Sequence, residues 1–221
     1  MTSPVVLFDL DGTLTDPKEG IVRCMDYALV RLGYENPGEA ALVNSIGPPL
    51  FNTFKELLHT NDQSLIQTAV ATYRERYSSI GLFENRVYEG IPEALERLSS
   101  SGATLVVATS KPEVFARQIV RYFGLDSWFK EVYGSELNGS LSDKKDLLGH
   151  VLERERISPT CSIMVGDREH DVVGAKGNGM RAIGVLWGYG GRVELEGAGA
   201  DWLCEAPSAL PGLVASKLPL G

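Results

Sequence analysis

The chain lacks the features that mark membrane, secreted or thiolate–metal proteins. Its 221 residues contain three cysteines, and no two of them form a CxxC pair, which argues against zinc ribbons and thioredoxin-like motifs. An odd number of well-separated cysteines is typical of a reducing compartment. No apolar run approaches the roughly 20 residues needed to cross a bilayer, and no basic segment followed by an apolar stretch marks a signal peptide. The sequence therefore predicts a soluble cytoplasmic protein.

Clusters of basic residues are also missing. The formal net charge is -8, whereas binding to nucleic acid or to an anionic membrane requires patches of Lys and Arg. We therefore expect no nucleic-acid partner and no membrane partner. Hydrophobic residues make up 43% of the chain and charged residues 23%, which are ordinary values for a globular protein with a sizeable core.

Short apolar runs alternate with helical patterns along most of the chain. The runs rich in Val and Ile, which are typical of buried strands, span residues 5–8, 105–108, 163–165 and 182–186, with a weaker run at 131–134. Helical patterns span residues 91–102, 111–124 and 142–155, the last with Ser142 as its expected N-cap. This alternation predicts an α/β fold with a doubly wound, Rossmann-like parallel sheet.

One long interval interrupts the alternation. Residues 16–83 separate the first strand from the helix at residue 91, although connections within α/β units are usually short. Apolar residues recur at helical spacing from Ile21 to Leu32 and again from Leu65 to Tyr73. We therefore predict a core formed by residues 1–15 and 84–221, and an inserted α-helical cap subdomain formed by residues 16–83.

Polar residues follow three of the expected strands, at the point where each strand ends. They are Asp9 and Asp11 after the first strand, Thr109, Ser110 and Lys111 after the second, and Asp167 and Asp171 after the third. In a doubly wound sheet the carboxyl ends of the strands lie along one edge, where ligands bind. We therefore expect these three polar clusters to converge.

Asp9 and Asp11 are expected to be neighbours, because side chains at positions i and i+2 of an extended segment point the same way. Two carboxylates about 4 Å apart repel by roughly 4 kcal/mol at an effective dielectric of about 20, so either some are protonated or a cation joins them. Oxygen ligands without His or Cys favour a hard cation, and Mg²⁺ commonly bridges carboxylates to a phosphate. The sequence therefore predicts a Mg²⁺ site and phosphoryl-transfer chemistry.

Four segments resemble the motifs of the haloacid dehalogenase superfamily. They are DLDGT at residues 9–13, VVATS at 106–110, Lys144, and GDREHD at 166–171. The resemblance covers nearly the whole chain and implies a C1-type helical cap for the insertion. The segments ATSKPEVFA and IGPPL are similar to the phosphoglycolate-phosphatase-like branch, which also contains 5′-nucleotidases.

This resemblance implies a Mg²⁺-dependent phosphatase. Asp9 would be the nucleophile that forms an aspartyl-phosphate, and Asp11 would protonate the leaving oxygen and later deprotonate the attacking water. True haloacid dehalogenases lack the second carboxylate, so its presence favours phosphate esters. Lys144 would offset the charge of the nucleophile and the phosphoryl group, with the adjacent Lys145 as the alternative.

The resemblance also implies how the two ligands are held. The metal ligands would be Asp9, the backbone carbonyl of Asp11, Asp167 and, directly or through water, Asp171. The phosphoryl oxygens would be bound by Thr109 and by the backbone N–H groups of Gly12, Thr13 and Ser110. Since His170 has no ligand role in the family pattern, we expect it to be a surface residue. The glycine-rich segment at residues 188–192 is expected to form a mobile turn near the site.

The expected substrate is a small phosphorylated metabolite, either phosphoglycolate or a nucleoside 5′-monophosphate. A monomer or a homodimer is expected. A sugar-phosphate mutase shares the same motifs, and a phosphorylatable receiver-like module shares the acidic pocket, although Asp11 and the large insertion argue against the receiver. Within the insertion, residues 45–50 either face the active site or form a simple turn. Arg23 and Arg76 either contact substrate or lie on solvated helix faces.

Overall fold

The computed structural model describes residues 4–218. The chain divides into two compact units, which are described separately. Unit 1 comprises Met1–Thr15 and Val87–Gly221, and unit 2 comprises Asp16–Arg86. The second boundary thus follows residue 86, where the sequence predicts it after residue 83. The outer bounds predicted for the core, residues 1 and 221, lie outside the described residues.

Unit 1 is built on a parallel sheet. Within residues 4–218, six strands run in the order β5-β4-β1-β6-β7-β8. They are β1 (Val5–Phe8), β4 (Thr104–Pro112), β5 (Phe129–Ser135), β6 (Ser162–Gly166), β7 (Arg181–Val185) and β8 (Trp202–Cys204). The sequence pattern predicts the first five but not β8, which has 3 residues. Because β1 pairs in parallel with both β4 and β6, the three strands that precede the polar clusters are adjacent.

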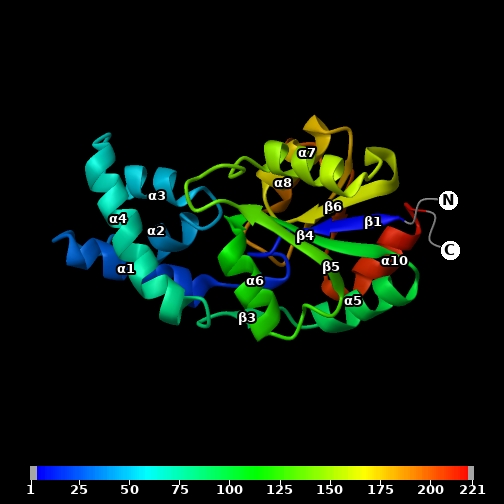
Figure 1. Ribbon diagram of the computed structural model, residues 1–221, viewed down its shortest axis with the longest axis horizontal. Helices are drawn as coiled ribbons and strands as arrows, with labels where there is room; N and C mark the ends of the chain where they lie inside the picture. Colours follow the sequence, from blue (N-terminus) through cyan, green and yellow to red (C-terminus); the bar gives the residue numbers. More distant parts are fainter. Residues whose placement is uncertain (1–3, 219–221) are drawn as a thin grey trace. The chain divides into compact units, whose positions relative to one another are not determined.

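Helices cover both faces of this sheet, as the alternating pattern predicts. Figure 1 shows α7 and α8 over one face and α5, α6 and α10 over the other. These helices are α5 (Ile91–Ser100), α6 (Glu113–Tyr122), α7 (Lys144–Glu155), α8 (Glu169–Gly177), α9 (Arg192–Gly197) and α10 (Leu210–Ala215). Val5 and Leu7 of β1 pack in one cluster with residues of α7 and α8 such as Val151 and Val172. Burial of this apolar surface is the main force that favours folding.

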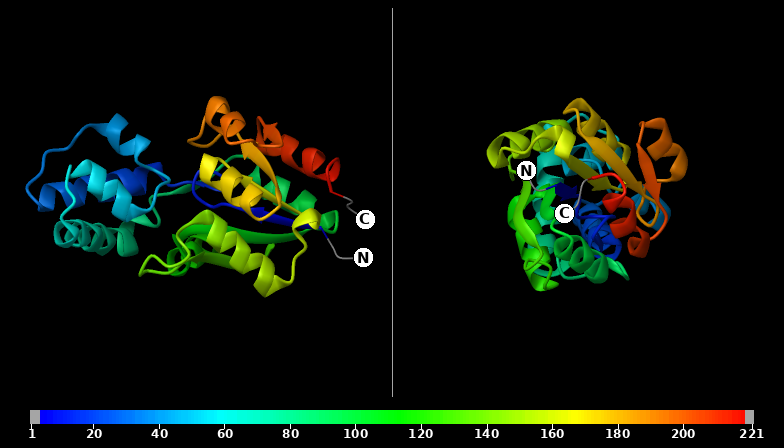
Figure 2. Two further views of the ribbon diagram at one scale, coloured as in Figure 1. Left: turned by 90° about the horizontal axis from the view of Figure 1, so that it is seen from above. Right: turned by 90° about the vertical axis from the view of Figure 1, so that its right-hand side faces the viewer.

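Unit 2 is formed by helices that lie side by side, coloured blue to cyan in Figures 1 and 2. They are α1 (Lys18–Arg31), α2 (Glu39–Asn44), α3 (Leu50–Leu57) and α4 (Gln63–Arg76), followed by a π-helical turn (Tyr77–Gly81). Most of the residues predicted to face inward are buried, including Met25 and Ile66, whereas Leu32 is only partly buried. The segment at residues 45–50 joins α2 to α3, and its orientation toward the active site stays a prediction.

A separate two-stranded sheet pairs β2 (Thr15–Asp16) with β3 (Arg86–Val87), where the chain leaves and re-enters unit 1. Short 3₁₀ helices span Pro159–Cys161 and Pro207–Ala209. Among the described helices, none combines the length and the apolar character needed to span a membrane.

Helix α7 is capped by Asp143 and not by Ser142, so the predicted N-cap is wrong by one position. Oδ1 of Asp143 accepts hydrogen bonds from the backbone N–H groups of Lys145 at 2.8 Å and Asp146 at 3.2 Å. A carboxylate at this position satisfies donors that have no partner inside the helix and interacts favourably with the helix dipole. The helix therefore begins at Lys144.

Replacement of this cap should destabilise the protein. We expect Asp143→Ala to lower the free energy of unfolding by about 1 kcal/mol, because two backbone donors lose their acceptor. The matched variant Ser142→Ala should change it by less than about 0.5 kcal/mol. Urea denaturation followed by circular dichroism measures both values, and a larger effect for Ser142→Ala would contradict the assignment.

Candidate active site

A buried ion-pair cluster lies at the carboxyl edge of the sheet in unit 1. Oδ1 of Asp9, directly after β1, accepts a hydrogen bond from Nζ of Lys144 at 2.8 Å. The same ammonium group donates to the carbonyl of Ala108 at 3.0 Å and lies 2.8 Å from Oδ1 of Asp171. Burial lowers the pKa of Lys144, but the charges of Asp171 and Asp9 outweigh burial, so the pKa is raised. The adjacent Lys145 is exposed, so of the two lysines it is Lys144 that enters the cluster.

Three carboxylates converge beside this ammonium group. Asp9, Asp167 and Asp171 each offer one oxygen, and these oxygens all lie within 4.8 Å of one another. The three residues are 8%, 0% and 2% exposed. Burial, reinforced by the charges of Asp171 and Asp9, raises the pKa of Asp167 to about 8. To charge all three groups without a neighbouring cation is therefore unfavourable.

The donor set fits a hard divalent cation. It consists of carboxylate oxygens, which such ions prefer. Burial raises the pKa of Asp171 even though Lys144 opposes the shift. Lys144 thus compensates the negative charge of the cluster only in part, and a divalent ion at the point of convergence would offset the rest. The cluster thus has the electrostatic requirement for a cation that the sequence predicts.

The carboxylate of Asp11 lies outside this group of three and has a different partner. Its Oδ2 pairs with Nζ of Lys111, at the end of β4. Its Oδ1 is buried and has no hydrogen-bond partner within the described chain. Burial raises the pKa of Asp11, and the charge of Lys111 opposes this shift. Lys111 is one of the polar residues expected at the end of this strand, but the motifs imply no role for it.

A tight turn after Asp11 brings the DLDGT segment against Asp167. Gly12 has a φ of 83°, and a Cβ there would lie 2.2 Å from Oδ2 of Asp167, so only glycine fits. Oγ1 of Thr13 donates to Oδ1 of Asp167 at 3.3 Å. The N–H groups of Gly12 and Thr13 donate to the carbonyls of Thr15 at 2.8 Å and Leu10 at 3.3 Å. To bind phosphoryl oxygens, as predicted, these two N–H groups would have to give up their hydrogen bonds to Thr15 and Leu10.

Thr109 and Ser110 lie at the carboxyl end of β4, beyond the carbonyl of Ala108 that Lys144 contacts. Thr109 is 2% exposed, and its Oγ1 accepts a hydrogen bond from the backbone N–H of Lys111 at 3.3 Å. The carbonyl of Ser110 accepts from Oγ of Ser135 at 2.8 Å. The structure thus places both residues at the predicted edge, and their contacts with a phosphoryl group stay predictions.

The glycine-rich segment at residues 188–192 packs directly against Asp167. The backbone N–H of Tyr189 donates to Oδ2 of Asp167 at 2.8 Å. A Cβ at Gly188 would lie 2.3 Å from the carbonyl oxygen of Gly12 and 2.4 Å from Cβ of Asp167. The expected proximity to the site is confirmed. The Tyr189 N–H and the close packing of Gly188 thus hold Asp167 in place, and the mobility of the turn stays a prediction.

Sequence reasoning missed two anchoring residues, Trp187 and Glu194, since neither belongs to a local motif. Nε1 of Trp187 donates to the carbonyl of Thr13 at 3.0 Å. Oε1 of Glu194 accepts from Nε of Arg168 at 2.8 Å and from the N–H of Glu169 at 2.9 Å. These contacts tie the segments after β7 to the loops that carry the acids. His170, in the same loop region, is exposed, as predicted.

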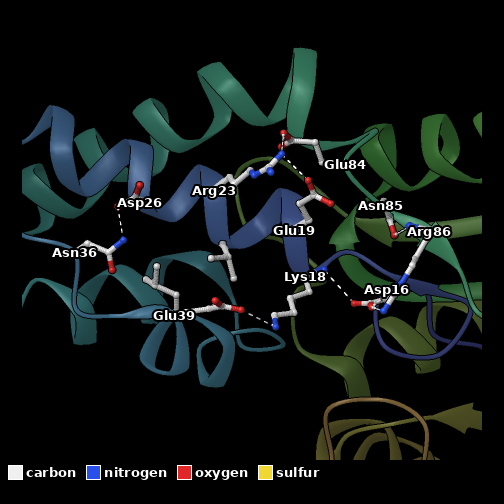
Figure 3. Close-up of a pocket in the computed structure, with 12 residues that line it drawn as sticks. Asp16, Lys18, Glu19, Arg23, Asp26, Asn36, Glu39, Glu84, Asn85 and Arg86 are labelled. Carbon is white, nitrogen blue, oxygen red and sulfur yellow. Dashed lines mark hydrogen bonds and ion pairs between the residues drawn. The ribbon is translucent and has the colours of Figure 1, made fainter.

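Unit 2 contains a separate pocket of about 560 Å³ that is lined by residues of α1 and by residues 84–86, among others (Figure 3). Each of its three cations pairs with a carboxylate. The pairs are Lys18–Glu39 at 2.7 Å, Arg23–Glu19 at 2.5 Å, Arg23–Glu84 at 2.7 Å and Arg86–Asp16 at 2.6 Å. The positive charge in this pocket is thus compensated within the unit, and the cluster in unit 1 remains the candidate for phosphoryl chemistry.

Arg76 is neither a solvated surface residue nor a member of this pocket. Its guanidinium forms a bidentate pair with Glu84, at 2.6 and 2.9 Å, and its Nη1 lies 3.1 Å from Sγ of Cys24. Arg23, by contrast, lines the pocket and is exposed. For Arg76 the contacts indicate a role in the fold of unit 2.

The packing around Gly188 generates a stability prediction. Gly188→Ala should lower the free energy of unfolding by about 1–3 kcal/mol, because the added methyl group overlaps Gly12 and Asp167. Gly191→Ala is the matched control, since nothing lies within 4 Å of a Cβ at that position. Thermal unfolding of both variants tests this, and equal effects would contradict the packing argument.

Comparison with known proteins places these features in a family. The sequence model that describes the family of haloacid dehalogenase-like hydrolases matches residues 6–185 of this chain. A 5′-nucleotidase of Pseudomonas aeruginosa is 48% identical over 207 residues, which cover 94% of this chain and 93% of that protein. The tyrosine-protein kinase PtkA of Mycobacterium tuberculosis is 39% identical over 186 residues, 84% of this chain and 63% of that protein.

The structure is also similar to the crystal structure of a predicted phosphatase from Clostridium acetobutylicum. The TM-score is 0.92 at 39% sequence identity, and the match covers 98% of this chain and 100% of that one. The family match includes all four segments on which the sequence resemblance rests. The chain therefore belongs to the haloacid dehalogenase-like hydrolases.

Proposed function

We propose that the protein is a Mg²⁺-dependent phosphatase that hydrolyses a small phosphate monoester through an aspartyl-phosphate on Asp9. The observation that supports this best is the environment of Asp9 itself. It lies buried at the end of the central strand, in contact with Lys144 and close to the oxygens of Asp167 and Asp171. A second acid, Asp11, follows two residues later with a partner of its own.

In the first step, a carboxylate oxygen of Asp9 attacks phosphorus. The bond between this oxygen and phosphorus forms while the bond from phosphorus to the leaving oxygen breaks. A proton on Asp11 passes to the leaving oxygen, so that the product departs as a neutral alcohol. The ammonium group of Lys144 stabilises the negative charge that Asp9 and the phosphoryl group bring together.

In the second step, water attacks phosphorus and the bond to Asp9 breaks. The Asp11 carboxylate takes a proton from the attacking water, which restores its protonated form as inorganic phosphate leaves. Asp9, Asp167 and Asp171, with the backbone carbonyl of Asp11, would hold the Mg²⁺ ion. When bound, the ion would neutralise carboxylate and phosphoryl charge in this buried site.

For the substrate, we propose a nucleoside 5′-monophosphate first and phosphoglycolate second. The identity of 48% with a 5′-nucleotidase over nearly the full length of both chains supports the nucleotide. Phosphoglycolate follows from the resemblance of the sequence motifs. A sugar-phosphate mutase and a receiver-like module remain as alternatives. Because one relative is named a tyrosine-protein kinase, transfer of phosphate to a protein is a further alternative. The first experiment below separates these outcomes.

The first experiment measures inorganic phosphate release from a panel of esters. We expect release from nucleoside 5′-monophosphates, phosphoglycolate or both, in the presence of Mg²⁺, and loss of release with EDTA. Asp9→Asn should reduce the rate by at least about 10³-fold, because an amide cannot form the phosphoryl intermediate. Circular dichroism of Asp9→Asn checks that the variant is folded.

Other outcomes would replace the proposal. Isomerisation of a sugar phosphate without net phosphate release would indicate the mutase. A stable phosphoaspartate without turnover would indicate the receiver-like module. Transfer of phosphate from ATP to tyrosine would indicate a kinase. Hydrolysis that persists in Asp9→Asn would show that Asp9 is not the nucleophile.

The second experiment measures metal binding directly. Isothermal titration calorimetry with MgCl₂ should detect one site per chain, and Asp167→Asn should weaken binding by at least about 10-fold, because it removes a carboxylate from the converging set. Asp126→Asn is the matched control, since Asp126 is exposed and lies outside this set. Unchanged affinity in Asp167→Asn would contradict the proposed ligand set.

A further inference from the structure

Lys111 and Lys144 pair with different acidic residues of the site. Lys144 contacts Asp9 and Asp171, whereas Lys111 contacts Asp11. The side chains of Lys111 and Lys144 are 7% and 4% exposed, so both charges are placed inside the protein. A buried lysine costs desolvation energy unless it is paired. Because Lys111 is buried beside Asp11, its role is not to keep the surface soluble.

A break in the strand ladder directs Lys111 toward Asp11. Along β4 and β5 the pairing proceeds from Thr109 with Gly134 to Pro112 with Ser135. Gly134 and Ser135 are consecutive in β5, whereas Ser110 and Lys111 lie between their partners in β4. These two residues of β4 therefore have no pairing partner in β5. Such a bulge re-aims side chains and is common beside active sites.

The bulge is held at both of its residues. Oγ of Ser135 donates to the carbonyl of Ser110 at 2.8 Å. The N–H of Lys111 donates to Oγ1 of Thr109 at 3.3 Å. The base of the lysine side chain is therefore fixed by backbone contacts, while its ammonium end reaches Asp11.

This contact fixes the orientation of the Asp11 carboxylate. One oxygen, Oδ2, is occupied by Lys111, and the other, Oδ1, is buried and without a hydrogen-bond partner among residues 4–218. A carboxyl group held by one oxygen presents the other in a defined direction. For proton transfer in the transition state, the donor must lie within hydrogen-bond reach of the reacting oxygen.

We propose that Lys111 is a positioning residue that orients Asp11 so that Oδ1 faces the leaving oxygen of the substrate. The inference rests on the proposed function, in which Asp11 protonates that oxygen. Lys111 itself neither gains nor loses a proton in the step: the O–P bond to the leaving group breaks, and the proton of Asp11 moves to the freed oxygen. The alternative is that Lys111 binds the phosphoryl group directly.

The two roles differ in their dependence on the leaving group. An alkoxide, as in a nucleoside 5′-monophosphate, requires a proton when it leaves, whereas p-nitrophenolate leaves as a stable anion. The ratio kcat/KM reports the steps up to transfer to Asp9, so it isolates this event from the later hydrolysis. Loss of the positioning residue should therefore affect the alkyl ester selectively.

We expect Lys111→Met to lower kcat/KM for adenosine 5′-monophosphate, or for the best alkyl phosphate of the panel, by about 10²-fold, and for p-nitrophenyl phosphate by less than about 3-fold. Lys111→Arg should restore activity on the alkyl ester to within about 10-fold of wild type, because it retains the charge and the donors. Lys130→Met, which removes an exposed lysine paired with Glu155, should leave both values unchanged.

A double-mutant cycle tests the link to Asp11. In an Asp11→Asn background, Lys111→Met should reduce kcat/KM for the alkyl ester by less than about 2-fold further, because the group that it orients no longer donates a proton. Equal losses for both esters, or independent losses in the cycle, would overturn the proposal in favour of direct phosphoryl binding.

Crystal structures separate this inference from the proposed function. In Lys111→Met the Asp11 carboxylate should adopt a different rotamer, and in Lys111→Arg it should keep the wild-type one. An unchanged Asp11 in Lys111→Met would overturn the positioning role, even if the enzyme hydrolyses phosphate esters. An enzyme without hydrolytic activity would contradict the proposed function, and the rotamer would still decide the role of Lys111.

Discussion

The ion pair of Lys144 with Asp9 and Asp171 is the interaction around which the site is organised. It links the first residue of α7 to the end of β1 and to the first turn of α8. Removal of one partner from a buried pair typically costs about 3–5 kcal/mol, because the other charge is left uncompensated. The central place of β1 in the sheet and the cap at Asp143 matter to function because they bring these three groups to one point.

The sequence was sufficient to predict this convergence. Parallel strands end at a common edge, so Asp9 after β1 and Asp167 after β6 had to lie close together once the strand order was of the doubly wound type. Periodicity alone could not predict the bulge that carries Lys111 or the contact of Gly188 with Asp167. The bulge depends on the pairing register of β4 with β5, and the Gly188 contact depends on the packing of segments far apart in the chain. Neither produces a recognisable pattern in the local sequence.

The helical unit illustrates the same limit in another way. Its apolar spacing predicts α1 and α4, because burial of one helix face follows from a period of 3.6 residues. The partners of its charged residues are not encoded by spacing: Arg76 and Glu84 are paired in the structure and Arg23 shares that carboxylate. Both side chains of the Arg76–Glu84 pair are partly buried, and ion pairs that water can reach add little to stability. Charges that appear in the sequence as candidates for substrate binding can thus serve the fold.

Two chemically identical acids, two residues apart, acquire different environments because their cations come from different elements. The lysine beside Asp9 is supplied by α7, and the lysine beside Asp11 is supplied by the bulge of β4. A nucleophile and a proton donor must each be held in a fixed direction, and one shared cation could not orient both independently. The use of two separate elements allows each carboxylate to be placed without disturbing the other. The DxD segment therefore supplies only the two carboxylates. The lysines that hold them, Lys111 and Lys144, lie about a hundred residues or more further along the chain.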